Sequence, residues 1–143
     1  MKRQEILLAA LASVPNRAFR PVHLQKTLFL LDRRAPKLFS ATSRYDFQPY
    51  DYGPFDSAVY ADAEQLANEG LVEIDKDPVR GHKLYSATES GASRGAKLLK
   101  QLTRDQASAI ITTAKLVTKL SFRDLVAAIY KAYPDMKTNS VFK

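Results

Sequence analysis

Few side chains in this chain of 143 residues have the type and spacing that catalysis requires. The absence of Cys excludes thiol nucleophiles, disulfides and Cys-ligated metals, and two histidines, His23 and His82, are too few to predict a metal site. No Ser has a base and an orienting carboxylate in a pattern typical of a triad, and no Gly-rich phosphate loop occurs. Asp62 and Glu64 point to different sides of a predicted helix, which indicates a solvated face. We therefore expect no enzymatic activity, no catalytic residue, no metal and no cofactor.

Aromatic residues gather in the middle of the chain, between Tyr45 and Tyr60. Exposed Tyr favours binding surfaces, because it buries a large area and loses little conformational entropy. A buried aromatic core with hydroxyl groups at its rim would produce the same pattern, and the sequence leaves both interpretations open. Gly53 is expected to allow a tight turn, and Pro54 to preset the φ angle of a following helix. The candidate partner-binding residues are Gln25, Lys26, Tyr50, Tyr52, Gly53, Pro54, Phe55 and Tyr60.

The basic excess of the chain is unevenly distributed. The formal charge of +7 divides into +7 for residues 1–44, −7 for 45–90 and +7 for 91–143. Basic proteins bind nucleic acid or other polyanions because Lys and Arg displace counterions from phosphates, whereas an acidic middle opposes such binding. Charged faces that serve solvation alone explain the same clusters. The candidate nucleic-acid-binding residues are Arg17, Arg20, Arg80 and Lys83.

Hydrophobic periodicity predicts a mainly α-helical chain with a small β component. An aromatic–polar alternation over 45–52 indicates an edge or irregular strand that ends at Gly53, while 71–74 and 83–87 indicate a hairpin. Pro54 is expected to begin a helix that continues to Gly70. The expected helices cover 2–13, the segment from Pro21 to Pro36, 54–70, 90–102, 105–118 and 122–133.

The order of these elements is that of a winged helix-turn-helix domain extended by C-terminal helices. Gly70 can end the third helix with a positive φ, and Thr88 is placed to cap the helix after the wing. We expect a single domain over 1–143, with a winged-helix core over 1–100 and a helical extension over 101–143. The apolar stretch 6–14 is too short to span a bilayer, so we expect no membrane partner and a cytoplasmic location.

Several short motifs resemble a known group of proteins. The segment LQKTLFLL at 24–31 precedes FQPYDYGPF at 47–55 and the pair Val59-Tyr60, and IYKAYP follows at 129–134. In this order they resemble the Panacea (SocA-like antitoxin) and YwgA-like proteins, bacterial and phage-associated families that combine an "L-x-K-L-L-F" helix with a "Y-G-P" turn and a following "V-Y". For Panacea members the resemblance implies toxin neutralisation through protein contacts, in some cases aided by a host chaperone or protease. Many YwgA-like members have no assigned activity.

The predicted third helix distinguishes two classes of partner. Residues 54–70 contain four acidic side chains and no Lys or Arg, so phosphates would repel this helix from the major groove. We therefore expect nucleic-acid binding to be weak. The leading hypothesis is a non-enzymatic, antitoxin-like or defence-associated module that binds a protein partner, either a toxin or a defence component. The alternative is a transcriptional regulator that binds DNA through its basic terminal regions. An enzyme is the third and least favoured functional class. The sequence leaves open whether the protein forms a homodimer.

Overall fold

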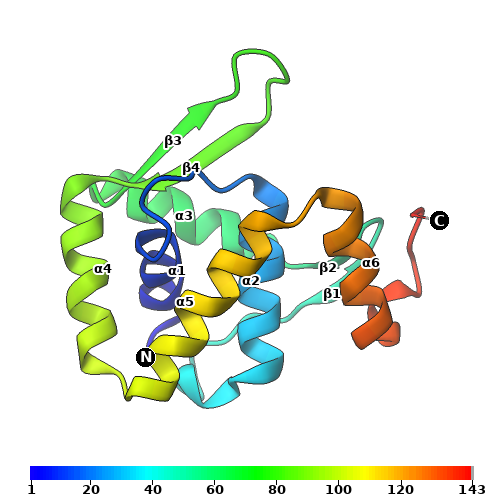
Figure 1. Ribbon diagram of the computed structural model, residues 1–143, viewed down its shortest axis with the longest axis horizontal. Helices are drawn as coiled ribbons and strands as arrows, with labels where there is room; N and C mark the ends of the chain where they lie inside the picture. The colour runs from blue at the N-terminus through cyan, green and yellow to red at the C-terminus, as the bar shows by residue number, and fades with distance from the viewer. Residues whose placement is uncertain (143) are drawn as a thin grey trace.

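The structure, a computed structural model, describes residues 1–142; Lys143, the last residue of the expected domain, lies outside them. The described chain is mainly helical with two small antiparallel sheets, which confirms the predicted fold class (Figure 1). None of its helices has both the length and the apolar character needed to cross a bilayer. The helices are α1 (Arg3–Ala12), α2 (Pro21–Arg34), α3 (Ala58–Asn68), α4 (Glu89–Gln101), α5 (Arg104–Lys119) and α6 (Phe122–Ala132), with short 3-10 helices η1 (Pro36–Leu38) and η2 (Pro134–Lys137). The strands are β1 (Gln48–Tyr50), β2 (Gly53–Phe55), β3 (Val72–Lys76) and β4 (Lys83–Ala87).

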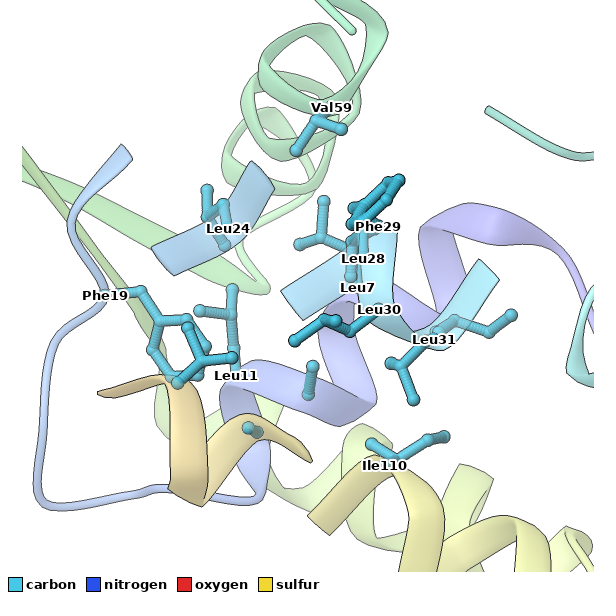
Figure 2. Packing of buried hydrophobic residues seen from close by; sticks show 14 of the residues in the cluster. Leu7, Leu11, Phe19, Leu24, Leu28, Phe29, Leu30, Leu31, Val59 and Ile110 are labelled. Atoms are coloured by element: carbon cyan, nitrogen blue, oxygen red, sulfur yellow. The ribbon is translucent and has the colours of Figure 1, made fainter. Parts of the chain in front are cut away.

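The hydrophobic core surrounds α1. Every residue of this helix from Ile6 to Leu11 is buried, and a helix that is apolar all round is typical of a central position. The helices α2, α3, α4 and α5 all pack against it. Figure 2 shows Leu7 of α1 close to Leu28 of α2 and Leu11 of α1 close to Phe19, with Ile110 of α5 below them. The C-terminal extension therefore contributes to the same core as the preceding helices.

The predicted wing is confirmed. β3 and β4 pair antiparallel as a hairpin that projects from the helices (Figure 1). Gly70 ends the preceding helical segment with φ +78°, a value that favours glycine. The Oγ1 of Thr88 accepts a hydrogen bond of 3.0 Å from the backbone N–H of Gly91, so the predicted N-cap of α4 is also present.

A third, single-residue strand completes the winged-helix topology. The N–H of Phe19 donates to the carbonyl of Tyr85 at 2.7 Å, and the N–H of Tyr85 donates back at 2.8 Å. Phe19 lies between α1 and α2, so the connection between these helices is tied to β4 at the base of the wing. The position of the wing relative to α2 is therefore set by a backbone bridge as well as by side-chain packing.

The segment expected to begin the third helix forms a strand instead. β1 and β2 pair around two turn residues, with Pro49 opposite Pro54 and Tyr50 opposite Gly53. In a two-residue hairpin the pair beside the turn is hydrogen-bonded and the next pair is not, so the prolines occupy positions that need no N–H. Gly53 adopts φ +107°, which would strain any residue with a side chain. The helix α3 consequently begins at Ala58, and the prediction that Pro54 starts it is wrong.

The C-terminal part of the chain lies against this first hairpin. Both of its strands contact η2, and β2 also contacts α6. The N–H of Val141 donates to the carbonyl of Asp51 at 2.9 Å, and the Nδ2 of Asn139 donates to the carbonyl of Pro49 at 3.0 Å. Figure 1 shows α6 and the hairpin together on the side of the molecule away from α4. The hairpin is thus enclosed between α2 and the C-terminal segment.

Candidate binding pocket at the first hairpin

A pocket of about 500 Å³ opens between α2, the β1–β2 hairpin, α3 and the start of α6. Its size is that of a typical site for a small ligand or an inserted side chain. Every predicted partner-binding residue except Pro54 lines it, although these residues come from segments up to 35 positions apart. The lining residues are Val22, Gln25, Lys26, Tyr50, Asp51, Tyr52, Gly53, Phe55, Tyr60 and Phe122.

The side chain of Gln25 fastens the hairpin to α2. Its Nε2 donates to the carbonyl of Asp56 at 2.9 Å, and its Oε1 accepts from the N–H of the same residue at 3.0 Å. A primary amide can form this pair of bonds because it carries both a donor and an acceptor, as a peptide group does. Gln25 is buried, so it supports the pocket wall from behind. The bonds replace those that a neighbouring strand would make just beyond the end of β2.

Lys26 is a buried cation on the same helix. Its side chain reaches the predicted turn residue Pro54, whose carbonyl accepts a hydrogen bond of 3.1 Å from Nζ. Only 4% of Lys26 is exposed, and no ion pair involves it among the described residues 1–142. Burial lowers the pKa of Lys26 from 10.5 to about 8, which leaves the ammonium mostly protonated at pH 7. The pocket therefore contains a positive charge that pairs with no carboxylate of residues 1–142.

Aromatic rings form the walls and the rim. The ring of Phe55 stacks on Tyr50 with centroids 5.0 Å apart and meets Tyr60 edge-on at 5.8 Å. Tyr52 meets Phe122 of α6 edge-on at 5.3 Å. Tyr50 is 54% exposed and Tyr52 is 47% exposed, so both stand at the mouth. Such contacts fix the ring directions while leaving area for a partner.

The two interpretations of the aromatic cluster apply to different residues. Tyr45 belongs to the core, where its hydroxyl donates to Asp62 at 2.6 Å; burial and this bond raise its pKa far above the usual range. Burial also raises the pKa of the half-buried Tyr60. Tyr50 and Tyr52 lie on the surface. Sequence spacing could not separate these roles, because the burial of each ring depends on which distant segments pack over it.

The sequence analysis missed Phe122 as a pocket residue. It is 37% exposed at the first position of α6, and it lines the pocket beside Tyr52. The local signal was an aromatic side chain placed directly after the helix cap Ser121, where solvent exposure is expected. Its partner is 70 positions earlier in the chain, so no periodicity connects the two residues.

The four candidate nucleic-acid contacts lie in different local environments. Arg17 donates to the carbonyl of Thr118 at 2.8 Å, and this bond attaches the segment between α1 and α2 to α5. The guanidinium of Arg20 approaches the ring of His82 at 3.4 Å, Lys83 pairs with Glu64, and Arg80 is exposed in the wing loop. They extend from the exposed connection between α1 and α2 to the wing loop.

The prediction that Asp62 and Glu64 lie on a solvated face of α3 is only partly correct. Asp62 is buried, with Arg3 Nε at 3.0 Å from its Oδ2, whereas Glu64 and Glu69 are exposed. Burial of Asp62 is stabilised by this ion pair and by the hydroxyl of Tyr45. The exposed face of α3 still lacks Lys and Arg, so the repulsion expected against phosphate applies to the remaining carboxylates.

His23 is a structural residue. Its Nδ1 accepts the N–H of Arg20 at 3.0 Å at the start of α2. Burial, together with the charges of Arg20 and Arg17 and with His82, lowers its pKa to about 4, so the ring is neutral at pH 7. Within residues 1–142, no three His, Asp or Glu side chains are grouped so that they could hold a metal ion.

No protein-family model matches this chain, and no curated protein sequence matches it.

Proposed function

We propose that this protein is a non-enzymatic protein-binding module of the antitoxin-like or defence-associated kind, and that the pocket with its tyrosine rim contacts the partner. The observation that carries this proposal is the half exposure of Tyr50 and Tyr52 on a hairpin that Gln25 and Lys26 hold against α2. Rings held in place before binding lose little entropy when a partner covers them.

The resemblance to Panacea and YwgA-like proteins supports the class of partner. Its helix motif contains Lys26, its turn motif contains Gly53 and Pro54, and Tyr60 ends the short motif that follows. These residues, separate in the sequence, meet at the pocket through the hydrogen bond from Lys26 to Pro54. A toxin or a defence component is accordingly the partner that we propose.

Co-expression with a toxin encoded by a neighbouring gene tests this function. We expect the protein to restore growth and to co-purify with the toxin, and the double variant Tyr50→Ala, Tyr52→Ala to lose both while retaining its melting temperature. Val79→Ala is the matched control, because Val79 is 91% exposed and lies in the wing loop. Equal rescue by the double variant and the control would contradict the proposed surface.

A DNA-binding regulator is the second candidate. The observation in its favour is a row of exposed basic side chains on α4, namely Arg94, Lys97 and Lys100. Such a patch neutralises phosphates without base contacts, so we expect weak binding to any duplex that falls steeply with salt. Fluorescence anisotropy with a random duplex and with the chain's own promoter fragment measures both. Tight, promoter-specific binding that is lost on changing exposed residues of α3 would favour this candidate over the first.

A further inference from the structure

We propose that the pocket binds a carboxylate carried on an apolar body, with the ammonium of Lys26 as the counter-ion and the aromatic rings around the apolar part. The C-terminal residue of a polypeptide presents this combination, as does a free aromatic carboxylate. The inference deepens the proposed function by naming the chemistry that a partner brings to the pocket, and it rests on that function only for the polypeptide source.

The first argument is the unbalanced charge of Lys26. An ammonium has three N–H donors, and among the described residues the carbonyl of Pro54 is the acceptor that Nζ contacts. Asp51 is the acidic residue of the pocket lining, and it is exposed and makes no ion pair with Lys26. Lysine is almost never fully buried unless it is paired. A methionine would fill the same volume without the desolvation of a charge, so packing alone does not explain a lysine here.

The second argument is access to that charge. Gly53 lines the pocket, and a Cβ at this position would lie 3.5 Å from Nζ of Lys26 and 3.4 Å from Cε1 of Tyr130. A side chain there would therefore lie against the ammonium, and glycine leaves space beside it. The turn requires glycine for its backbone angle as well, so one residue both shapes the hairpin and opens the floor of the pocket.

The third argument selects a carboxylate over a phosphate. Among the described residues, the pocket lining contains one cationic side chain, Lys26, and one exposed carboxylate, Asp51, so it can balance at most a single negative charge of a ligand. Phosphate sites use several cations, arginine forks or clustered backbone N–H groups. Arg20 lies in an adjoining hollow that shares Val22 and Phe122 with the pocket, and its guanidinium is directed at His82. A monoanion therefore fits the floor better than a dianion.

The fourth argument concerns the apolar body. Phe55 and Tyr60 form half-buried walls, and Tyr50, Tyr52 and Phe122 surround the mouth. The volume of about 500 Å³ accommodates an aromatic side chain together with a carboxylate. A C-terminal aromatic or large aliphatic residue carries both groups on one Cα, so one residue can occupy the floor and the walls at once.

Three defined probes test the proposal on the whole chain. They are N-acetyl-glycyl-phenylalanine as the acid, the same dipeptide as the C-terminal amide, and 3-phenylpropionate. We expect NMR titrations at pH 7 to show the acid binding about tenfold more tightly than the amide, with shift changes at Gly53 and Tyr60. Lys26→Met should abolish this preference, whereas Lys83→Met, on the wing, should retain it.

Each outcome decides a separate point. Tighter binding of the peptide acid than of 3-phenylpropionate supports a chain end, and the reverse order supports a free carboxylate; both support the chemistry. Equal binding of acid and amide, or no binding of any probe to the folded wild type, overturns it, and this comparison needs no variant. The probes contain no toxin, so a failed toxin rescue leaves this result intact. Conversely, toxin binding that survives Lys26→Met but not the tyrosine variant would overturn a toxin chain end as the source of the carboxylate and keep the protein-binding module.

Discussion

The molecule contains two hairpins that are stabilised in opposite ways. The wing has five residues in each strand and projects from the helices, with a backbone bridge at its base and Val79 almost fully exposed in its loop (Figure 1). The first hairpin has only three residues in each strand. Its second strand is hydrogen-bonded to α2, and its turn is hydrogen-bonded to the C-terminal segment. Short isolated hairpins are marginal in water, so external bonds and packing determine which hairpin is rigid.

The two hairpins also differ in how they carry charge. Lys83 of the wing is exposed and forms an ion pair with Glu64, with 3.5 Å between Nζ and Oε1. Lys26 beneath the first hairpin is buried without a carboxylate. Exposed pairs change stability little, whereas a buried charge without a partner lowers it. Packing alone does not explain a buried charge that lowers stability, and this difference is the reason for proposing the binding site at the first hairpin.

Removing the amide that fastens the first hairpin should have the largest effect. We expect Gln25→Ala to lower the free energy of unfolding by about 3 kcal/mol, because it removes a buried amide with both of its bonds and leaves the N–H of Asp56 without a partner, while the Asp56 carbonyl keeps only the N–H of Val59. Urea denaturation measures the change. Lys83→Ala, which removes an exposed wing pair, is the comparison and should change stability by less than about 1 kcal/mol. Similar losses in both variants would mean that the hairpins are equally dependent on side-chain bonds.

Removing the buried charge should stabilise the protein. The lowered pKa of Lys26, about 8 against 10.5, corresponds to about 3 kcal/mol, of which the lost bond to Pro54 offsets about 1 kcal/mol. We therefore expect Lys26→Met to raise the free energy of unfolding at pH 7 by about 2 kcal/mol. Between pH 8 and 10.5 the unfolded wild type binds a proton that the folded protein releases, so wild-type stability rises relative to the variant and the gap narrows. A variant less stable than the wild type at pH 7 would contradict the interpretation that the buried charge of Lys26 lowers stability.

Acid should affect the base of the wing. His23 meets the ring of Phe19, which is bridged to β4, and its folded pKa of about 4 lies below the unfolded value of 6.5. As pH falls from 6.5 to 4 the unfolded chain binds a proton that the folded protein does not, so about 3 kcal/mol of stability is lost.

The variant His23→Gln isolates this effect. Glutamine at the same position can accept the N–H of Arg20 and does not titrate. We expect thermal unfolding of the variant to depend less on pH between 6.5 and 4 than that of the wild type. Parallel pH profiles for the two proteins would show that other groups cause the acid loss.

The smallest change is expected at the wing loop. Val79 is 91% exposed, so Val79→Ala removes no buried area and should alter the free energy of unfolding by less than about 0.5 kcal/mol. Partner capture and carboxylate binding should stay at wild-type levels. A loss of either would indicate that the binding surface lies on the wing and not on the first hairpin. Surface plasmon resonance titrations of Val79→Ala and of Tyr52→Ala, measured in parallel, distinguish these two locations.

Much of the fold could be predicted because its signals are local. The caps at Thr88 and Ser121 and the positive φ at Gly70 depend on a few neighbouring residues, and all three are present. The strand at Gly53 to Phe55 could not be predicted in the same way. Pro54 is equally suited to a first helical turn, and a strand requires a partner segment with the matching register.

The candidate site also has features that local sequence indicated and features that depend on distant segments. The residue types alone indicated an aromatic binding region with Gln25 and Lys26 nearby, since Tyr, Phe and a turn glycine are chemically informative at any position. Their proximity in a pocket could not be read from spacing, and neither could the addition of Phe122. The burial of Asp62 was also hidden, because its partner Arg3 lies in the first turn of α1.

The sequence by itself determined the helices, the wing and the types of side chain available for binding, because backbone preferences and hydrophobic periodicity act over one or two turns of chain. The tertiary structure alone decided that Lys26 is buried without a counter-ion, that Tyr50 and Tyr52 face solvent while Tyr45 does not, and that α6 closes one side of the pocket. Burial and electrostatic environment depend on which distant segments pack together, and that outcome is set by the whole core at once.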